Sequence, residues 1–228
     1  MSKEIWKSPL YPATDAVGEK HMIDVTQSIS AGLKHNEALV GHIIGWMKER
    51  GFTRVLDFGA GALRHTLALL DAGLEVTAVE FKQAYSRDKA GEKLKAARSR
   101  EGFIELYWPS DFLKKPAKKY DVAVLAFVLQ VVPNKTDRVR ILKEVAKRLD
   151  PIGPQRIYYA SRFGDAKNLK DDRKYKDGWI RGSGAATTFY TEWNAAETHA
   201  FMKKRGFVHA GRYGGSAQPF IYERNAGL

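Results

Sequence analysis

The chain contains no cysteine, which excludes several kinds of chemistry at once. Disulfides, thiolate zinc sites and mechanisms with a cysteine nucleophile all need that residue. The longest apolar run, residues 122–132, is interrupted by Gln130 and is too short to span a bilayer. Residues 1–20 lack the apolar segment of a secretory signal. We therefore expect a soluble, cytoplasmic protein with no membrane partner.

Acidic residues are in the minority. The 228 residues include 38 Lys and Arg against 26 Asp and Glu, which gives a formal net charge of +12. Such a surplus is typical of proteins that bind polyanions, but no known nucleic-acid-binding motif accompanies it. The charge leaves two interpretations open: contact with RNA or DNA, or simple solvation of helix faces.

The hydrophobic pattern alternates between strands and helices after residue 51. Alternation of this kind predicts a parallel sheet covered on both faces. Two further runs, separated by glycines, predict an antiparallel strand pair near the C-terminus. The expected parallel strands are 53–58, 74–81, 103–107, 121–127 and 157–161, and the expected pair is 207–213 with 218–223.

Two other segments are distinctive. A helical pattern runs from Ile23 to Arg50, so residues 1–50 are expected to form an N-terminal helical extension or cap before a single domain of residues 51–228. Residues 164–190 are polar, basic and rich in glycine, and loops of that length are usually functional or disordered. We expect these two segments to roof any pocket at the end of the sheet.

The stretch VLDFGAGALRHT, residues 55–66, places glycines where a strand ends and a helix begins. Glycines allow a sharp turn and close approach of a ligand, and parallel sheets bind ligands at this edge. Glu80 ends the next strand, where a carboxylate can accept hydrogen bonds from a ribose. A dinucleotide-binding fingerprint would need a third glycine at Arg64, so the pattern weighs against NAD or FAD.

The segment Asp57-Phe58-Gly59-Ala60-Gly61 resembles the D/E-x-G-x-G motif of class I S-adenosylmethionine-dependent methyltransferases. Glu80, the YWPSDF segment and YDVAVLAFVLQVVPN are similar to later segments of that family, in the same order. The resemblance implies a Rossmann-like, doubly wound, mostly parallel seven-stranded α/β sheet and S-adenosyl-L-methionine as cofactor. It implies cofactor contacts from the following residues: Asp57, Gly59, Ala60, Gly61, Glu80, Phe81, Asp111, Phe112, Ala126 and Phe127. In the family, the acid matched by Glu80 binds the ribose and that matched by Asp111 binds the adenine amino group.

Residues and motifs that the sequence lacks exclude several classes of methyl acceptor. Methyl transfer to pyrimidine C5 needs a cysteine, the adenine-specific motif is absent after the fourth strand, and no acid stands there for a metal. The histidines show no metal-binding spacing, and His65 is expected to face solvent. We therefore expect metal-independent transfer to an N or O nucleophile of a small or medium-sized acceptor.

Two alternatives stay open: a methyltransferase that acts on RNA or DNA through its basic surface, and a noncatalytic nucleotide-binding partner module. The sequence identifies neither a catalytic base nor an oligomeric state.

Overall fold

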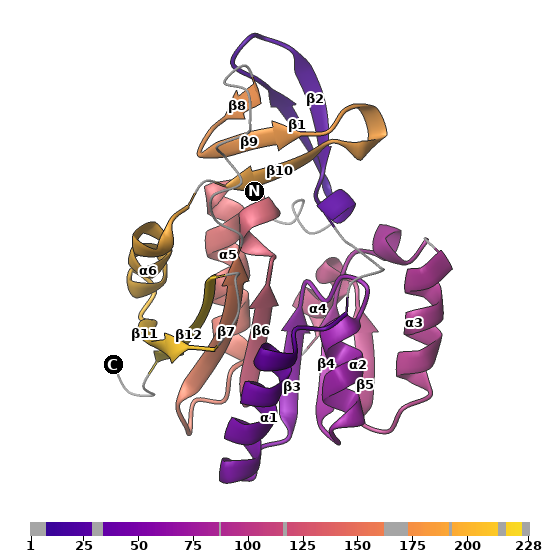
Figure 1. Ribbon diagram of the computed structural model, residues 1–228, viewed down its shortest axis with the longest axis vertical. Helices are drawn as coiled ribbons and strands as arrows, with labels where there is room; N and C mark the ends of the chain where they lie inside the picture. The colour runs from indigo at the N-terminus through magenta and orange to yellow at the C-terminus, as the bar shows by residue number, and fades with distance from the viewer. Residues whose placement is uncertain are drawn as a thin grey trace.

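The computed structural model describes residues 8–28, 34–86, 88–115, 118–161, 173–191, 193–213 and 218–224. A seven-stranded sheet forms the centre of the molecule (Figure 1). Its strand order is β11-β12-β7-β6-β3-β4-β5. The strands are β3 (Arg54–Phe58), β4 (Glu75–Val79), β5 (Phe103–Tyr107), β6 (Val122–Ala126), β7 (Gln155–Ser161), β11 (Val208–Arg212) and β12 (Gln218–Arg224).

Strands β3 to β7 are parallel, whereas β12 pairs antiparallel with both β7 and β11. The predicted α/β fold, with its mostly parallel sheet and closing antiparallel pair, is confirmed. Central strands such as β6 are buried on both faces, which explains their uninterrupted apolar sequence. The glycines predicted to separate β11 from β12, at 214 and 215, lie outside the described residues.

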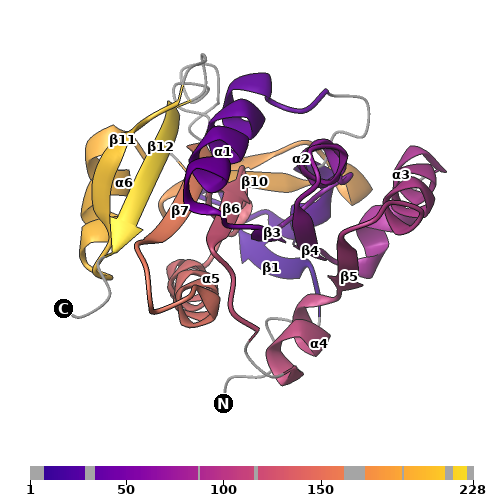
Figure 2. The same cartoon turned by 90° about the horizontal axis from the view of Figure 1, so that it is seen from below.

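Helices cover both faces of the sheet, and Figure 2 shows α1 and α2 on one side and α5 on the other. One core cluster joins the sheet to α1, α2 and α3, and a second joins it to α4, α5 and α6. No helix in the described part of the chain is long and apolar enough to cross a membrane. The helices are α1 (Glu37–Arg50), α2 (Arg64–Asp71), α3 (Asp88–Arg98), α4 (Pro109–Lys114), α5 (Lys135–Arg148) and α6 (Ala195–Lys203).

A separate layer, here called the cap, stands over the carboxyl ends of the parallel strands (Figure 1). It combines an N-terminal strand pair with a three-stranded sheet from the segment that follows β7. The Asp24 N–H donates to the Thr187 carbonyl at 2.9 Å and links the two parts. The cap consists of β1 (Leu10–Thr14), β2 (Lys20–Asp24), η1 (Val25–Ser28), β8 (Lys174–Tyr175), β9 (Gly178–Arg181), η6 (Gly184–Ala186) and β10 (Thr188–Thr191).

The cap differs from the sequence expectation in its secondary structure. The helix expected over 23–50 is shorter, because Ile23 lies in β2 and α1 begins only after its N-cap, Asn36. Of the polar stretch 164–190, the described part, from residue 173, forms strands and a short 3-10 helix. The boundary proposed between residues 50 and 51 stays a prediction.

Candidate functional site

The chain bends sharply between β3 and α2, as the glycines predicted. Gly59 and Gly61 have φ values of +74° and +54°, in the left-handed region that favours glycine. The N–H groups of Gly59 and Ala60 both donate to the Val79 carbonyl, at 2.8 and 3.1 Å. These bonds hold the bend against the end of β4, where Glu80 follows.

Gly59 also has a packing role. A Cβ atom at this position would lie 2.4 Å from Cγ2 of Val128, which is part of the loop after β6. No carbon atoms approach that closely without displacement, so a side chain at residue 59 would push the loop away. The bend of β3 and the loop after β6 therefore determine each other's position.

Glu80 is buried, 7% exposed, and its carboxylate joins the glycine bend to the residue that follows it, Phe81. One oxygen accepts the Gly61 N–H at 2.8 Å, and the other accepts the Phe81 N–H at 2.7 Å. Burial raises the pKa of Glu80 to about 7, although these two hydrogen bonds oppose the shift, and Asp57 and Asp24 raise it further. Each carboxylate oxygen keeps a lone pair for a ligand hydroxyl.

Asp57 lies beneath the bend rather than on its surface. Its Oδ2 accepts the Thr66 hydroxyl at 2.6 Å, and the residue is 2% exposed. Burial raises the pKa of Asp57 to about 6, while the Thr66 hydrogen bond and the charge of Arg64 lower it. Asp57 therefore connects the bend to the first turns of α2.

A pocket opens between this edge of the sheet and the cap, with an empty volume of about 680 Å³ that includes its open mouth. Gly59, Glu80, Phe81 and Phe127 line it together, so the structure brings these four predicted site residues to one place. Its other walls are mostly apolar and come from the loop after β6, from α5 and from the cap. The remaining lining residues are Tyr11, Val25, Phe58, Val79, Pro109, Val128, Val131, Val132, Asp137 and Ile141.

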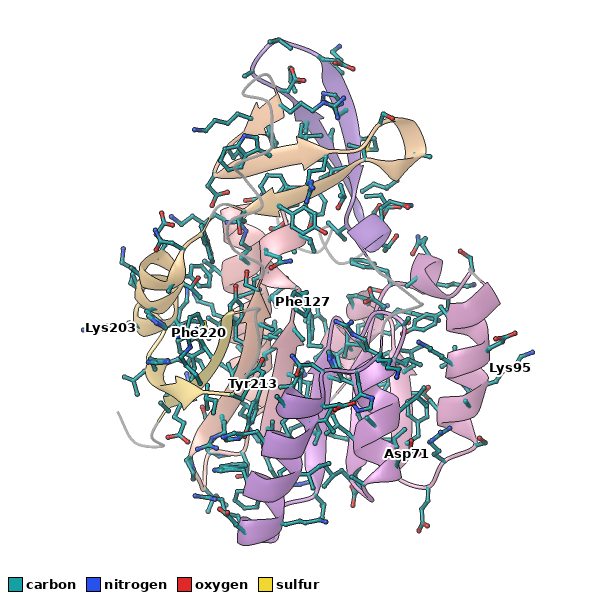
Figure 3. The ribbon with its side chains drawn as sticks, in the orientation of Figure 1. Asp71, Lys95, Phe127, Lys203, Tyr213 and Phe220 are labelled. Atoms are coloured by element: carbon teal, nitrogen blue, oxygen red, sulfur yellow. The ribbon has the colours of Figure 1, made fainter. Side chains whose placement is uncertain are left out.

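Phe127 lies where the sheet faces the cap (Figure 3). It follows Ala126, the half-buried last residue of β6, and its φ of +63° is unusual for a side-chain-bearing residue. Its N–H donates to the Ala160 carbonyl at 2.8 Å, which fixes this conformation. The Arg64 guanidinium lies 5.6 Å from the Phe127 ring centroid, so α2 contacts the same wall.

The structure does not bring Asp111 and Phe112 into the pocket. Asp111 lines a separate hollow beside β5, where the Lys114 Nζ lies 3.3 Å from its Oδ1. The Phe112 side chain is buried in the core, with its ring centroid 6.0 Å from that of Phe58. The Phe112 N–H donates to the Trp108 carbonyl within α4, so of this segment Pro109 is the residue that reaches the pocket.

The prediction that His65 faces solvent is wrong. The residue is 5% exposed, and its Nε2 has no hydrogen-bond partner among the described residues. Burial, together with the positive charge of Arg64, lowers the pKa of His65 to about 3, so the ring is neutral. His65 lies in the first turn of α2, and its ring is buried there. One polar residue near a helix start does not show from the sequence which way its side chain faces.

One group of possible metal ligands lies in the cap, at the turn between β1 and β2. Ligand atoms of Asp15, Glu19 and His21 come within 4.8 Å of one another. Asp15 is committed to the turn, since it accepts the N–H groups of Val17 and Glu19 and hydrogen-bonds His21 Nε2 at 2.7 Å. The group does not line the pocket, and hairpin geometry explains it.

Comparisons with known proteins agree with this architecture. No protein-family model matches the chain, and no relative is found among the curated proteins. Solved structures, in contrast, match most of it. A 1,6-didemethyltoxoflavin-N1-methyltransferase from Burkholderia thailandensis, with S-adenosylhomocysteine and 1,6-didemethyltoxoflavin bound, has a TM-score of 0.59 and 17% identity over 83% of this chain and 80% of its own. The chain has the fold of class I S-adenosylmethionine-dependent methyltransferases.

Two further structures have the same methyltransferase fold. An S-adenosylmethionine-dependent methyltransferase from Clostridium acetobutylicum has a TM-score of 0.60 at 13% identity, over 86% of this chain and 94% of its own. Magnesium protoporphyrin IX methyltransferase from Synechocystis, with S-adenosylmethionine bound, has a TM-score of 0.53 at 14% identity, over 82% and 78%. At these identities the similarity is one of fold.

Proposed function

We propose that the protein is an S-adenosylmethionine-dependent methyltransferase whose cofactor lies over the bend between β3 and α2. The observation that carries this proposal is the buried Glu80 carboxylate, held beside the glycine bend and next to an apolar pocket. Glu80 and Phe81 would hold the ribose, while Ala126 and Phe127 would border the methyl group. The amino-acid end would meet the bend formed by Gly59, Ala60 and Gly61, with Asp57 beneath it.

The electrostatics of the pocket favour a cationic ligand. Asp57 and Glu80 are both buried, each without an ion pair among the described residues, and Asp24 adds to the negative charge around Glu80. Burying unpaired carboxylates is costly, and a sulfonium or ammonium group nearby would reduce that cost. A ligand with a pyrophosphate would meet repulsion at the same place, which disfavours a dinucleotide. Arg64, at the start of α2, adds a positive charge near Asp57.

We propose transfer to an N or O nucleophile of a small or medium-sized acceptor. The pocket is closed on one side by Tyr11 and Val25 of the cap, and a cover of this kind suits a small molecule better than a polymer. The transferred methyl group is already activated in the cofactor, so the protein mainly has to align the acceptor and exclude water.

Calorimetry with S-adenosylmethionine and S-adenosylhomocysteine tests the cofactor. We expect both to bind, and Asp57→Ala and Glu80→Ala each to weaken binding by about 1–3 kcal/mol, the range for a lost buried hydrogen-bond partner. Asp71→Ala is the matched control, because Asp71 is an exposed acid paired with Arg100 at the far end of α2 (Figure 3). Unchanged affinity in both site variants, with folding intact, would rule out this placement.

The net charge of +12 supports a second candidate, a methyltransferase acting on RNA or DNA. Turnover of labelled cofactor with pooled metabolites and, separately, with RNA distinguishes the two candidates. Retention on RNA that does not weaken with salt would count against the nucleic-acid version, because binding to phosphates falls steeply as salt rises. Cofactor binding with no turnover in any pool would favour a noncatalytic module.

A further inference from the structure

Asp137 lies in the first turn of α5 and lines the pocket, yet the helix end does not use its side chain. The helix is capped instead by Asn134, whose side-chain oxygen accepts the Thr136 N–H at 3.0 Å. Asp137 is 4% exposed, and its Oδ2 has no hydrogen-bond partner among the described residues. A buried carboxylate oxygen without a partner is costly, so a donor placed beside it would be strongly favoured.

The side chains around Asp137 come from the cap and from α5, and in the described part of the chain they leave its Oδ2 without a hydrogen-bond donor. The Tyr11 side chain, from the cap, faces the carboxyl group and lowers its pKa. Arg140 forms a long ion pair with it, with its Nη1 4.0 Å from Oδ1, and Lys176 acts from the turn between β8 and β9. The neighbouring Arg138 is committed to Asp177. Burial raises the pKa of Asp137, and Tyr11 and the three cations oppose the shift.

The rest of this wall is apolar. Val25, Phe127, Val131, Val132 and Ile141 line the pocket together with Asp137 and Tyr11. An apolar wall with a few polar groups is the usual form of a small-molecule site, in which the polar groups fix the orientation of the ligand. Glu80 lies on the sheet side of the pocket and is assigned to the cofactor, whereas Asp137 comes from α5.

We propose that Asp137 anchors the methyl acceptor: its Oδ2 accepts a hydrogen bond from an N–H or O–H group of a largely apolar or aromatic molecule, and Tyr11 positions the carboxylate. The proposal rests on the proposed function and specifies the acceptor class for the same pocket. The anchored atom is the nucleophile. As this atom gains a methyl group from the methyl donor, its proton passes to the Asp137 carboxylate, so the charge of the acceptor is unchanged.

Pairs of aromatic probes that differ only in the donor test the anchor. Suitable pairs are 2-naphthol with 2-methoxynaphthalene, and benzimidazole with 1-methylbenzimidazole. Ligand-observed NMR titrations, with and without S-adenosylhomocysteine, give the affinity of each probe. We expect the wild-type protein to bind the donor-bearing member of at least one pair about tenfold more tightly, as a hydrogen bond to a charged group implies.

Single-residue variants test whether the preference for the donor-bearing probe depends on Asp137. Asp137→Ala should abolish the preference and Asp137→Asn should reduce it, without weakening the methylated probes. Tyr11→Phe should retain a preference, because Oδ2 stays available, and Asp71→Asn should behave as wild type. Circular dichroism and the midpoint of thermal unfolding establish that each variant is folded.

The outcomes separate this proposal from the proposed function. Equal affinities within every pair, no binding of any donor-bearing probe, or a preference that survives Asp137→Ala would overturn the anchor. If the donor preference follows Asp137 but S-adenosylhomocysteine does not bind, the cofactor assignment fails and the anchor stands. If S-adenosylhomocysteine binds and no pair is discriminated, the anchor fails and the cofactor assignment stands.

Discussion

Arg138 of α5 and Asp177 of the cap form a two-pronged ion pair, with Nη1 2.5 Å from Oδ2 and Nη2 2.7 Å from Oδ1. The Arg138 side chain is fully buried, and its Nε donates to the Val132 carbonyl at 2.7 Å. Trp193 Nε1 donates to Asp177 Oδ2 at 3.1 Å and covers the pair. One arginine therefore ties the loop after β6, helix α5 and the cap together around the pocket.

Breaking this pair should destabilise the protein far more than breaking a surface pair. Asp177→Asn leaves the Arg138 charge buried without compensation, and we expect a loss of about 3 kcal/mol in the free energy of unfolding, the low end for buried pairs because the Asp177 side chain is 35% exposed. Urea denaturation measures it. Asp71→Asn, which removes the exposed partner of Arg100, should cost less than about 1 kcal/mol. Equal losses would contradict the anchoring role.

The contact between Gly59 and Val128 predicts a rescue. Gly59→Ala should cost about 1–2 kcal/mol from its left-handed backbone and about 1–3 kcal/mol more from the clash with Val128. Gly51→Ala is the control, since Gly51 has a φ of +65° but nothing within 4 Å of an added Cβ. Adding Val128→Ala to Gly59→Ala should recover part of the loss, and no recovery would mean that strain alone matters.

Cofactor binding should depend on the ionisation of Glu80. A ribose donates to a carboxylate, so binding favours the charged form of a group whose pKa is about 7. S-adenosylhomocysteine should bind about tenfold more weakly one pH unit below that pKa than well above it. In Glu80→Gln this part of the dependence should disappear, while any titration of the ligand itself remains. Identical calorimetric pH profiles for the two proteins would contradict the ribose assignment.

His65 and Glu80 should affect stability against pH in opposite directions. The pKa of His65 falls from 6.5 to about 3 on folding, so the unfolded chain takes up a proton first and stability declines as pH drops through this range. The full effect is roughly 3–5 kcal/mol, at about 1.4 kcal/mol per unit. The pKa of Glu80 rises from 4.5 to about 7, so its contribution is greatest at low pH and declines toward pH 7.

Unfolding free energies of two variants separate these contributions. His65→Gln should flatten the acid decline below pH 6.5, whereas Glu80→Gln should remove the opposing contribution and make the acid decline steeper. Parallel pH curves for wild type and His65→Gln would show that the ring is not held neutral. Parallel curves for wild type and Glu80→Gln would show that folding does not raise the pKa of the Glu80 carboxyl group.

The central sheet could be predicted from the sequence because each strand has its own local signal. The stretch from Phe103 to Tyr107 was predicted with the bounds that the structure shows, and glycines marked the bend after β3. Central strands such as β6 are buried on both faces and therefore apolar throughout, and this pattern does not depend on distant partners.

The cap could not be predicted in the same way. Strands β1 and β2 expose much of their surface, and their buried residues Ala13 and Ile23 pack on Ile180 and Phe189, far away in the sequence. Asp137 was missed because an acid in the first turn of a helix is ordinary, and its missing partner is visible only in three dimensions. The adenine contact expected of Asp111 stays a prediction, because motif order does not specify which hollow of the fold a side chain lines.

The cap is built from one segment that precedes the parallel strands in the sequence and one that follows them, and this affects folding. The hydrogen bond from Asp24 to Thr187 closes a very long loop, and contacts of that kind form slowly because much chain entropy is lost first. During synthesis, β1 and β2 emerge before the strands on which they pack exist. The wall that would receive the acceptor can therefore be completed only once β8 to β10 have been made, later than the strands β3 and β4 that hold the glycine bend.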